Sequence, residues 1–371
     1  MQNLAHPLAA ALPALLLFGL AGAQAQTAGK GSPQGAAAQV VITGSVVERA
    51  LSDAPYAIST VGREELRSAG PQVNLSEVMA RVPGLVVANR WNFAQDLQIS
   101  SRGFGARAGF GVRGLRLYSD GIPASGPDGQ GQVSHFDIGG AERVEVLRGP
   151  FSVLYGNSSA GVISLVTAPV TGTRVEGAVD AGSFGLRQVR AQGEAVLAPS
   201  VDLRAGASAL EVDGFRPHSE ADKRQAHLRL GWQATARDSL LVTVNTLDQP
   251  AQDPLGLTRA QFDADPLQTT SQATQFDTRK TTEQTQLGAR WRHRYDSGLL
   301  REAQIALYAG QRDVVQFLAI PVAAQTASAN HGGGVIDFSR RYGGAEARVR
   351  LAIGEVDVVV GLAADRQRDD R

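Results

Sequence analysis

The sequence has no cysteine, no excess charge of either sign and, beyond its N-terminus, no long apolar run. Without cysteine, the chain can hold neither a disulfide framework nor a thiolate nucleophile nor a cysteine-ligated metal. Because 36 basic residues balance 36 acidic ones, no overall field attracts nucleic acid, and we expect no nucleic-acid partner. After the N-terminus, no apolar run reaches the roughly 20 residues that a transmembrane helix needs.

The N-terminus has the pattern of an export signal. The uncharged apolar run LAAALPALLLFGL occupies residues 8–20, and the triplet Ala23-Gln24-Ala25 follows it. A short apolar core before a small-x-small triplet is typical of a cleaved signal peptide, which we place at residues 1–25. Pro13 inside the run makes the alternative, a buried core helix, the weaker interpretation. We therefore expect the mature chain outside the cytoplasm.

Residues 26–53 are expected to form a flexible segment. As far as Ala38 the residues are mostly Gly, Ala, Gln, Ser and Thr, which cannot bury enough apolar surface to offset ordering. The β-rich stretch Gln39-Val40-Val41-Ile42-Thr43 follows. It predicts a short extended segment on a flexible tether.

Residues 54–170 have the pattern of a compact α+β domain. A polar helix is predicted around Glu64–Arg67 and ends at Gly70. In a second helix, Asn74 is the predicted N-cap and Glu77 stands three residues later, as in a capping box. The apolar face of this helix consists of Leu75, Val78, Met79 and Val82.

No enzyme is predicted from this region. Gly109–Gly114 matches the G-x-G-x-x-G dinucleotide fingerprint, but a strand pattern follows where a helix N-terminus is required. The histidines and acidic residues show no catalytic or metal-ligand spacing. We therefore predict no catalytic residue, no metal site and no cofactor.

After Thr171, polar and apolar residues alternate with a period of two. In Gln225–Ala234 every second residue is apolar or small and the others are mostly polar, as in a strand with two different faces. Nine strands are predicted, at residues 173–182, 186–198, 201–212, 225–236, 239–248, 280–295, 299–312, 341–352 and 355–365.

The connections between these strands alternate in length. Short turns such as Pro199-Ser200 and Arg237-Asp238 alternate with long polar connections at 213–224, 249–279 and 313–340. Short turns at one end and long loops at the other are the signature of a transmembrane β-barrel. A secreted β-sandwich also alternates and remains an alternative, although strands of 10 to 16 residues exceed the usual five or six.

Three segments resemble a known family. They are Ile99–Phe104 (ISSRGF), Leu117–Pro123 (LYSDGIP) and Glu142–Ile163, which reads ERVEVLRGPFSVLYGNSSAGVI. In this order and spacing they resemble the plug domain of TonB-dependent outer-membrane receptors, with Ala160 where a glycine is common. The resemblance covers residues 40–170 closely and the rest through the strand pattern.

This resemblance implies an α+β plug domain at 54–170, followed by an antiparallel transmembrane β-barrel at 171–371. The family's barrel has 22 strands, which at about ten residues each need roughly 220 residues before any loop. With about nine strands predicted, we expect a C-terminally truncated barrel that does not form a working transporter by itself.

The resemblance also implies a location and partners. The receptor is expected in the cell outer membrane, in contact with its lipid, and bound in the periplasm by TonB with its ExbB–ExbD motor. Family members offer TonB an extended segment, the TonB box, by strand addition. Gln39–Thr43 fits that role by position, β-branched composition and tether.

Inside a barrel, an unpaired charge is costly and a paired one can hold the plug in place. We therefore expect Arg102, Glu145 and Arg148 to form a plug–barrel lock. Family members bind their ligand at the outward apex of the plug, where the loops at 89–93 and 125–132 are expected. The predicted ligand-binding residues are Arg90, Trp91, Asn92, Asp128, Gln130 and Gln132.

The predicted function is active uptake of a scarce nutrient, with a ferric siderophore or iron chelate as the family's default ligand. Residues 102–107 and 127–132 also look similar to a branch that includes ferric-citrate-like receptors and a pyrroloquinoline quinone importer. A non-iron cofactor is therefore the alternative ligand. A passive outer-membrane pore or adhesin and a secreted β-sandwich enzyme are the alternatives from other classes. The short N-terminal segment predicts transport without surface signalling.

Overall fold

The computed structural model describes residues 41–42, 49–50, 57–88, 91–109, 111–131, 136–149, 152–156 and 158–371. All of them belong to the unit Val40–Arg371. The predicted signal peptide lies outside the described residues, as do Gln39, Val40 and Thr43 of the predicted TonB box. The remaining two residues of that box form β1 (Val41–Ile42), which pairs antiparallel with β2 (Arg49–Ala50).

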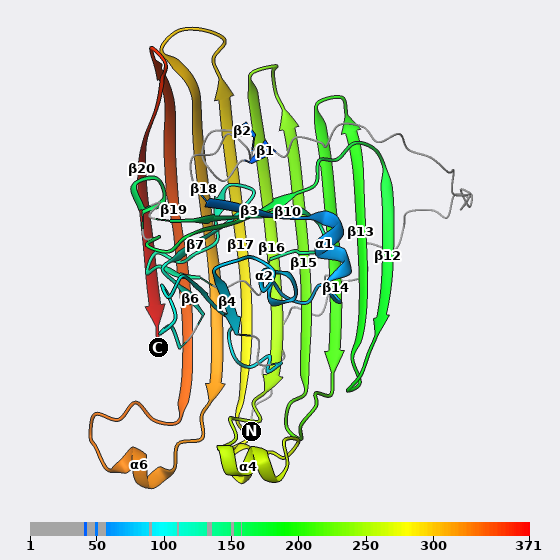
Figure 1. Ribbon diagram of the computed structural model, residues 1–371, viewed down its shortest axis with the longest axis vertical. Helices are drawn as coiled ribbons and strands as arrows, with labels where there is room; N and C mark the ends of the chain where they lie inside the picture. Colours follow the sequence, from blue (N-terminus) through cyan, green and yellow to red (C-terminus); the bar gives the residue numbers. More distant parts are fainter. Residues whose placement is uncertain are drawn as a thin grey trace, which may run out of the picture. The chain divides into compact units, whose positions relative to one another are not determined.

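The α+β domain extends from β3 to β11 (Figure 1). Its central strand, β10, pairs antiparallel with β3 and β11; β11 pairs parallel with β7, and β7 pairs with β8. Two small sheets, β4–β5 and β6–β9, complete it. Its elements are β3 (Ala57–Gly62), α1 (Arg63–Ser68), α2 (Ser76–Met79), β4 (Leu85–Ala88), β5 (Gln98–Ser101), β6 (Val112–Arg113), β7 (Leu115–Ser119), β8 (Ile122–Pro123), β9 (Gln130–Gly131), β10 (Ala141–Arg148), α3 (Ser152–Tyr155) and β11 (Gly161–Thr167).

Both predicted helices are present. The α2 helix begins two residues after Asn74, and Leu75 occupies its N-cap position. Asn74 still stabilises the helix start, because its Oδ1 accepts the Ser76 N–H at 2.9 Å and its own N–H donates to Glu77 Oε1 at 3.1 Å. The predicted apolar face is buried throughout and joins the core of the domain.

One glycine of the predicted plug motif is required by close packing. Gly161, the first residue of β11, has φ +127° beside Leu147 of β10. A β-carbon at this position would lie 2.0 Å from the Leu147 carbonyl oxygen, so no other residue fits without moving the strand. Sheet geometry therefore accounts for the glycine in this part of the motif.

The second part of the chain is one nine-stranded antiparallel sheet in which each strand pairs with the next along the chain (Figure 1). The long connections carry α4 (Arg259–Ala264) and α5 (Ser271–Phe276), then α6 (Val322–Thr326). The strands are β12 (Arg174–Ala181), β13 (Arg187–Ala198), β14 (Val201–Val212), β15 (Ala221–Gln233), β16 (Asp238–Gln252), β17 (Arg279–Arg294), β18 (Leu300–Phe317), β19 (Val335–Ile353) and β20 (Val356–Asp370).

All nine predicted strands are present, but several are longer than predicted. The predicted long connection at 313–340 is wrong at both ends, because Asp313 pairs with Ser339 and Phe317 with Val335. Val314 and Val315 stand side by side, as do Val335 and Ile336, so the period of two that identifies a strand is lost there. The pairing itself continues.

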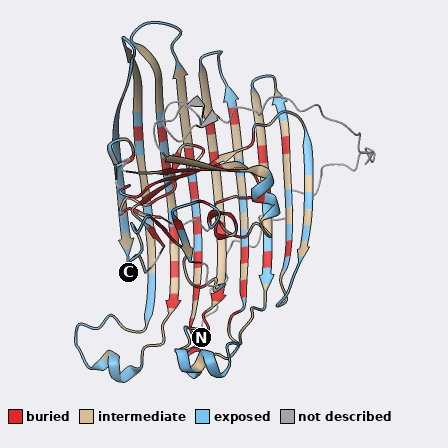
Figure 2. Cartoon of the chain, viewed as in Figure 1, coloured by how far each residue is buried: buried red, intermediate tan, exposed pale blue. Residues whose placement is uncertain are grey.

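The polarity of this sheet is the reverse of that of a soluble protein. On β17 the buried residues include Lys280, Gln284 and Gln286, whereas Leu287 on the opposite face is 51% exposed. The exposed face also carries Val189, Leu228, Ile305 and Leu307. Figure 2 shows buried residues in the α+β domain and at intervals along β13–β18, with the two edge strands mainly exposed. A β-sandwich buries its apolar face, so the sandwich alternative is wrong.

No helix in the described parts of the chain is long and apolar enough to cross a membrane.

Candidate functional site

The polar face of the nine-stranded sheet contacts the α+β domain in three regions. In the first, the residues after β4 bind Asp253, which directly follows β16. Asn92 Nδ2 donates to Asp253 Oδ1 at 2.7 Å, and Gln95 Nε2 donates to Asp253 Oδ2 at 2.6 Å. Asp253 is only 4% exposed, so these two amides largely replace water around its carboxylate.

Neighbouring contacts strengthen the same region. The Gln249 side chain of β16 donates to the Phe93 carbonyl oxygen at 2.8 Å. Lys280 Nζ of β17 lies 2.9 Å from Asp96 Oδ1, and both side chains are about nine-tenths buried. The segment after β4 is therefore held by the ends of two adjacent strands.

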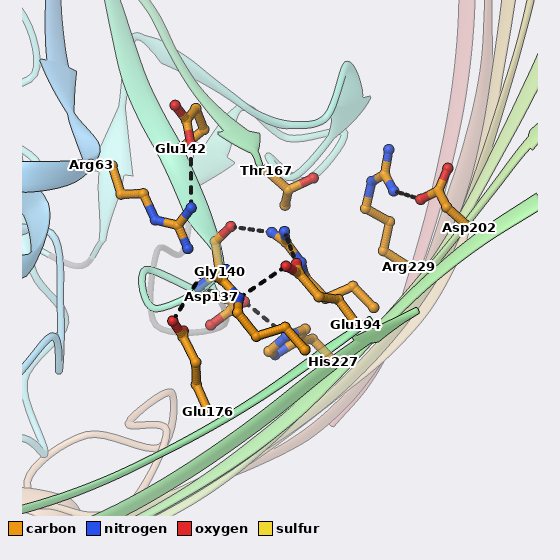
Figure 3. A network of polar contacts seen from close by, with 12 residues as sticks. Arg63, Asp137, Gly140, Glu142, Thr167, Glu176, Glu194, Asp202, His227 and Arg229 are labelled. Carbon is orange, nitrogen blue, oxygen red and sulfur yellow. Dashed lines mark hydrogen bonds and ion pairs between the residues drawn. The ribbon is translucent and has the colours of Figure 1, made fainter. Parts of the chain in front are cut away.

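The second region, drawn in Figure 3, joins the loop before β10 to β13, β14 and β15. Arg204 of β14 is completely buried. Its guanidinium donates to the Gly140 carbonyl oxygen at 2.7 Å and to Glu194 Oε2 of β13 at 2.6 Å. His227 Nε2 of β15 lies 3.0 Å from Asp137 Oδ2.

The surroundings of Asp137 favour its charged form. Burial alone would raise the pKa of the Asp137 carboxyl, but His227, the Gly140 N–H and Arg204 together hold that pKa below its ordinary value. The Asp137 carboxylate is therefore ionised at neutral pH. An ion pair with the sheet requires this charged form.

The third region is built around a buried arginine of the α+β domain. Arg116 of β7 is 4% exposed, and its Nη2 lies 3.5 Å from both Glu346 Oε1 of β19 and Asp365 Oδ2 of β20. Tyr118 donates its hydroxyl to Glu346 Oε1 at 2.9 Å and accepts from Arg348 at 3.2 Å. Burial, with help from Glu346, raises the pKa of Tyr118 to about 12, so the phenol keeps the proton that it donates.

Beside this cluster, β17 comes close to β8 at two points. Gln286 Nε2 of β17 donates to the Pro123 carbonyl oxygen at 2.9 Å. A β-carbon on Gly288 would lie 2.7 Å from Ile122 Cγ2, so the absence of a side chain at Gly288 lets β8 sit directly on β17.

The predicted lock residues occupy different surroundings. Glu145 is fully buried in β10 and accepts from Arg143 at 2.7 Å. Arg148 donates to Ser59 Oγ at 2.9 Å and to the Pro83 carbonyl oxygen, so these contacts stay within the α+β domain. Burial and the nearby Arg102 lower the pKa of Arg148, and Arg102 itself is exposed. A lock made by these residues stays a prediction.

The predicted ligand-binding residues are only partly available to a ligand. Asn92 is bound to Asp253, and Asp128 Oδ2 lies 3.3 Å from Arg340 Nη1 of β19. Gln130 lies in β9. Trp91 is 52% exposed and has φ +49°, which is uncommon for a bulky residue. Arg90 and Gln132 lie outside the described residues.

Sequence reasoning missed the residues that make most of the contacts between the domain and the sheet. Arg204, Asp253 and Glu346 lie on or next to strands that were interpreted only by their alternation. A signal was available, because a charged side chain on the enclosed face of such a strand needs a partner. The identity of the partner could not be read from the pattern.

Comparison with known proteins identifies the family. Residues 50–163 match the model of the TonB-dependent receptor plug domain. The chain therefore carries the plug domain of the TonB-dependent receptors. The vitamin B12 transporter BtuB of Vibrio vulnificus is 26% identical over 180 residues, which are 47% of this chain and 28% of that protein. The pesticin receptor of Yersinia pestis is 34% identical over 167 residues, which are 44% of this chain and 22% of that protein.

Solved structures agree on the fold. The unliganded ferric citrate transporter FecA superposes with a TM-score of 0.66 at 19% identity, covering 85% of this chain and 48% of that one. The ferripyoverdine receptor of Pseudomonas aeruginosa gives 0.63 at 16% identity, covering 88% and 44%. The chain therefore spans about half the length of these receptors. By comparison with these structures, the α+β domain corresponds to the plug, and the nine strands correspond to part of the barrel wall.

Proposed function

We propose that this receptor takes up a ferric siderophore or a similar iron chelate across the outer membrane, driven by TonB. The main observation in support is a TonB-dependent receptor plug bound to the polar face of a sheet whose other face is apolar. Such a sheet fits a barrel wall, with lipid on one side and the plug on the other. No bond is made or broken in the ligand, so the receptor is not an enzyme.

The outer face of the wall suits a membrane. Beside the exposed aliphatic residues, Trp232 and Tyr295 lie close to the short turns and are 47% and 37% exposed. Aromatic side chains gather at membrane–water interfaces, and short turns face the periplasm. We therefore place the short turns in the periplasm and the helix-bearing connections outside the cell.

The plug controls the path through the receptor. Ligand binds near the outward apex, where Trp91 is exposed, and TonB, energised by ExbB–ExbD, binds the TonB box Gln39–Thr43 from the periplasm. Pulling on this segment breaks the plug–wall contacts and opens a path. We place the signal peptide at 1–25, the flexible segment at 26–53, the plug at 54–170 and the barrel strands from 171.

The relatives' names do not agree on a ligand: they include vitamin B12, hemin, pesticin and ferric citrate. Iron is our choice because several of the structural neighbours are named for ferric chelates. An organic cofactor such as pyrroloquinoline quinone is the alternative.

The test is accumulation of iron-55 by cells that carry this plug and these nine strands within a closed receptor barrel in their outer membrane. Iron is supplied as ferric citrate or as hydroxamate or catecholate siderophores, to matched strains with and without TonB. We expect at least one chelate to accumulate, and only in the strain with TonB. Equal accumulation in both strains would instead indicate a passive pore. Accumulation of pyrroloquinoline quinone but of no iron chelate would establish the alternative ligand.

A further inference from the structure

The connection between β16 and β17, residues 253–278, begins at a buried carboxylate that also holds the plug. Asp253 Oδ1 accepts Asn92 Nδ2 of the plug at 2.7 Å and the Leu255 N–H of the connection at 2.9 Å. The other carboxylate oxygen, Oδ2, accepts Gln95 Nε2 of the plug at 2.6 Å. One side chain therefore binds the plug and the connection at the same time.

The neighbouring connection, residues 213–220 between β14 and β15, is fastened to the same segment. The planar guanidinium of Arg216 donates to three backbone carbonyl oxygens at once. They belong to Pro254 at 3.0 Å, Leu255 at 2.7 Å and Gln268 at 2.7 Å. In the opposite direction, Thr269 donates its hydroxyl to the Pro217 carbonyl oxygen at 2.5 Å. The two connections therefore form one hydrogen-bonded unit, and Asp253 joins this unit to the plug.

The connection between β18 and β19 is built differently. Among the residues that the structure describes, its hydrogen bonds stay within residues 318–334. The Leu318 N–H, for example, donates to the Gly334 carbonyl oxygen at 2.8 Å and closes the connection on itself. This connection therefore serves as a reference that is not joined to the plug in the same way.

We propose that Asp253 is a positioning residue that couples the plug apex to the connections 213–220 and 253–278. While the plug lies against the wall, Asn92 and Gln95 fix Asp253, and both connections stay ordered. When the plug leaves, the buried carboxylate loses two of the three N–H donors described above, which is costly, so the start of the connection moves. The outer rim of the ligand site then loosens in the same step that opens the path. The inference deepens the proposed function and rests on it.

The absence of cysteine lets a nitroxide spin label report on one chosen residue. Ala260→Cys carries the label on α4 of the coupled connection, and Ala324→Cys carries it on α6 as the reference; both alanines are exposed. Spectra are recorded in outer membranes that hold this plug and these strands within a closed receptor barrel. Asn92→Ala with Gln95→Ala should raise the ratio of mobile to immobile label at residue 260 by at least about tenfold, because one hydrogen bond to a charged group already contributes about that factor. The ratio at residue 324 should stay the same.

A control variant separates this coupling from a general loosening of the plug. Tyr118→Phe removes the hydroxyl that the plug donates to Glu346 of the wall, and it leaves Asp253 with all of its partners. The label at residue 260 should therefore stay as immobile as in the unaltered receptor.

The coupling can also be tested from the barrel side, where the plug residues that bind Asp253 are unchanged. Two sites linked through one equilibrium affect each other equally. Arg216→Ala unfastens the two connections and should therefore mobilise a label placed at the plug apex by Trp91→Cys. Arg187→Ala, at an exposed residue of β13, should leave that label unchanged.

Three results would overturn the proposal: no change at residue 260 when the two plug amides are removed, an equal change at residue 324, or an equal change at residue 260 with Tyr118→Phe. An apex label that ignores Arg216→Ala would overturn it as well. None of these measurements needs a ligand or TonB, so the uptake experiment with and without TonB can fail independently.

Discussion

Replacing Ile42 with proline is expected to abolish TonB-dependent uptake while the receptor still reaches the membrane and binds its ligand. Strand addition to TonB uses backbone N–H groups, and proline removes one and clashes with its surroundings. The loss should exceed about tenfold, because one lost hydrogen bond and the clash together exceed about 1.4 kcal/mol. The measurement is the initial rate of iron-55 accumulation at saturating chelate.

Two controls separate the TonB contact from local structure. Ile42→Ala keeps the backbone donor and should retain most of the uptake. Arg49→Pro disturbs the same β1–β2 pair from the other strand, since Arg49 pairs with Ile42, and should also retain uptake. If Arg49→Pro abolishes uptake as fully as Ile42→Pro does, the β1–β2 pair matters in its own right, and the assignment of the TonB box is wrong.

The second large effect is expected at Glu346. Glu346→Ala removes one of the two carboxylates beside the buried Arg116, the carboxylate partner of Arg348 and the acceptor of the Tyr118 hydroxyl. Removing one member of a buried ion pair costs about 3–5 kcal/mol, and we expect the lower end because Asp365 remains. The measurement is the urea concentration at which a protease begins to cleave the plug of the folded receptor.

The matched control is an exposed pair between the same two parts of the receptor. Glu176→Ala removes the partner of Arg67, 3.0 Å away, where both side chains are more than a third exposed. Such a pair contributes less than about 1 kcal/mol, so the protease transition should barely move. Equal shifts for Glu346→Ala and Glu176→Ala would show that the buried cluster does not hold the plug.

Local patterns predicted most of the fold. The face of α2 could be read from apolar residues at helical spacing, because a short helix must bury one side. The nine strands could be read from their period of two, because lipid and plug impose opposite demands on the two faces of each strand. The strand ends at Phe317 and Val335 could not, because pairing continues there without that contrast.

For the plug–wall contacts, the type of residue could be predicted from the sequence, but the partners could not. The sequence shows charges where an enclosed face is expected, but Asn92 and Asp253 stand 161 residues apart, and no period relates them. Arg148 illustrates the same limit, since its position in the plug motif gave no sign that Ser59 and Pro83 would be its partners. Partners of this kind depend on the three-dimensional register of separate sheets.

In the proposed function, the ligand passes only when the plug leaves the wall. The close approach of Ile122 to Gly288 allows a reversible tether, because a β-carbon on Gly288 would lie 2.7 Å from Ile122 Cγ2, and a disulfide brings two β-carbons to about 3.8 Å. Ile122→Cys with Gly288→Cys creates the only disulfide the chain can form. The decisive measurement is iron-55 uptake by cells carrying this variant, before and after oxidation. We expect oxidation to stop uptake and reduction to restore it, while neither treatment changes the uptake of either single variant. Uptake that continues with the disulfide fully formed would show that the ligand passes without the plug leaving the wall.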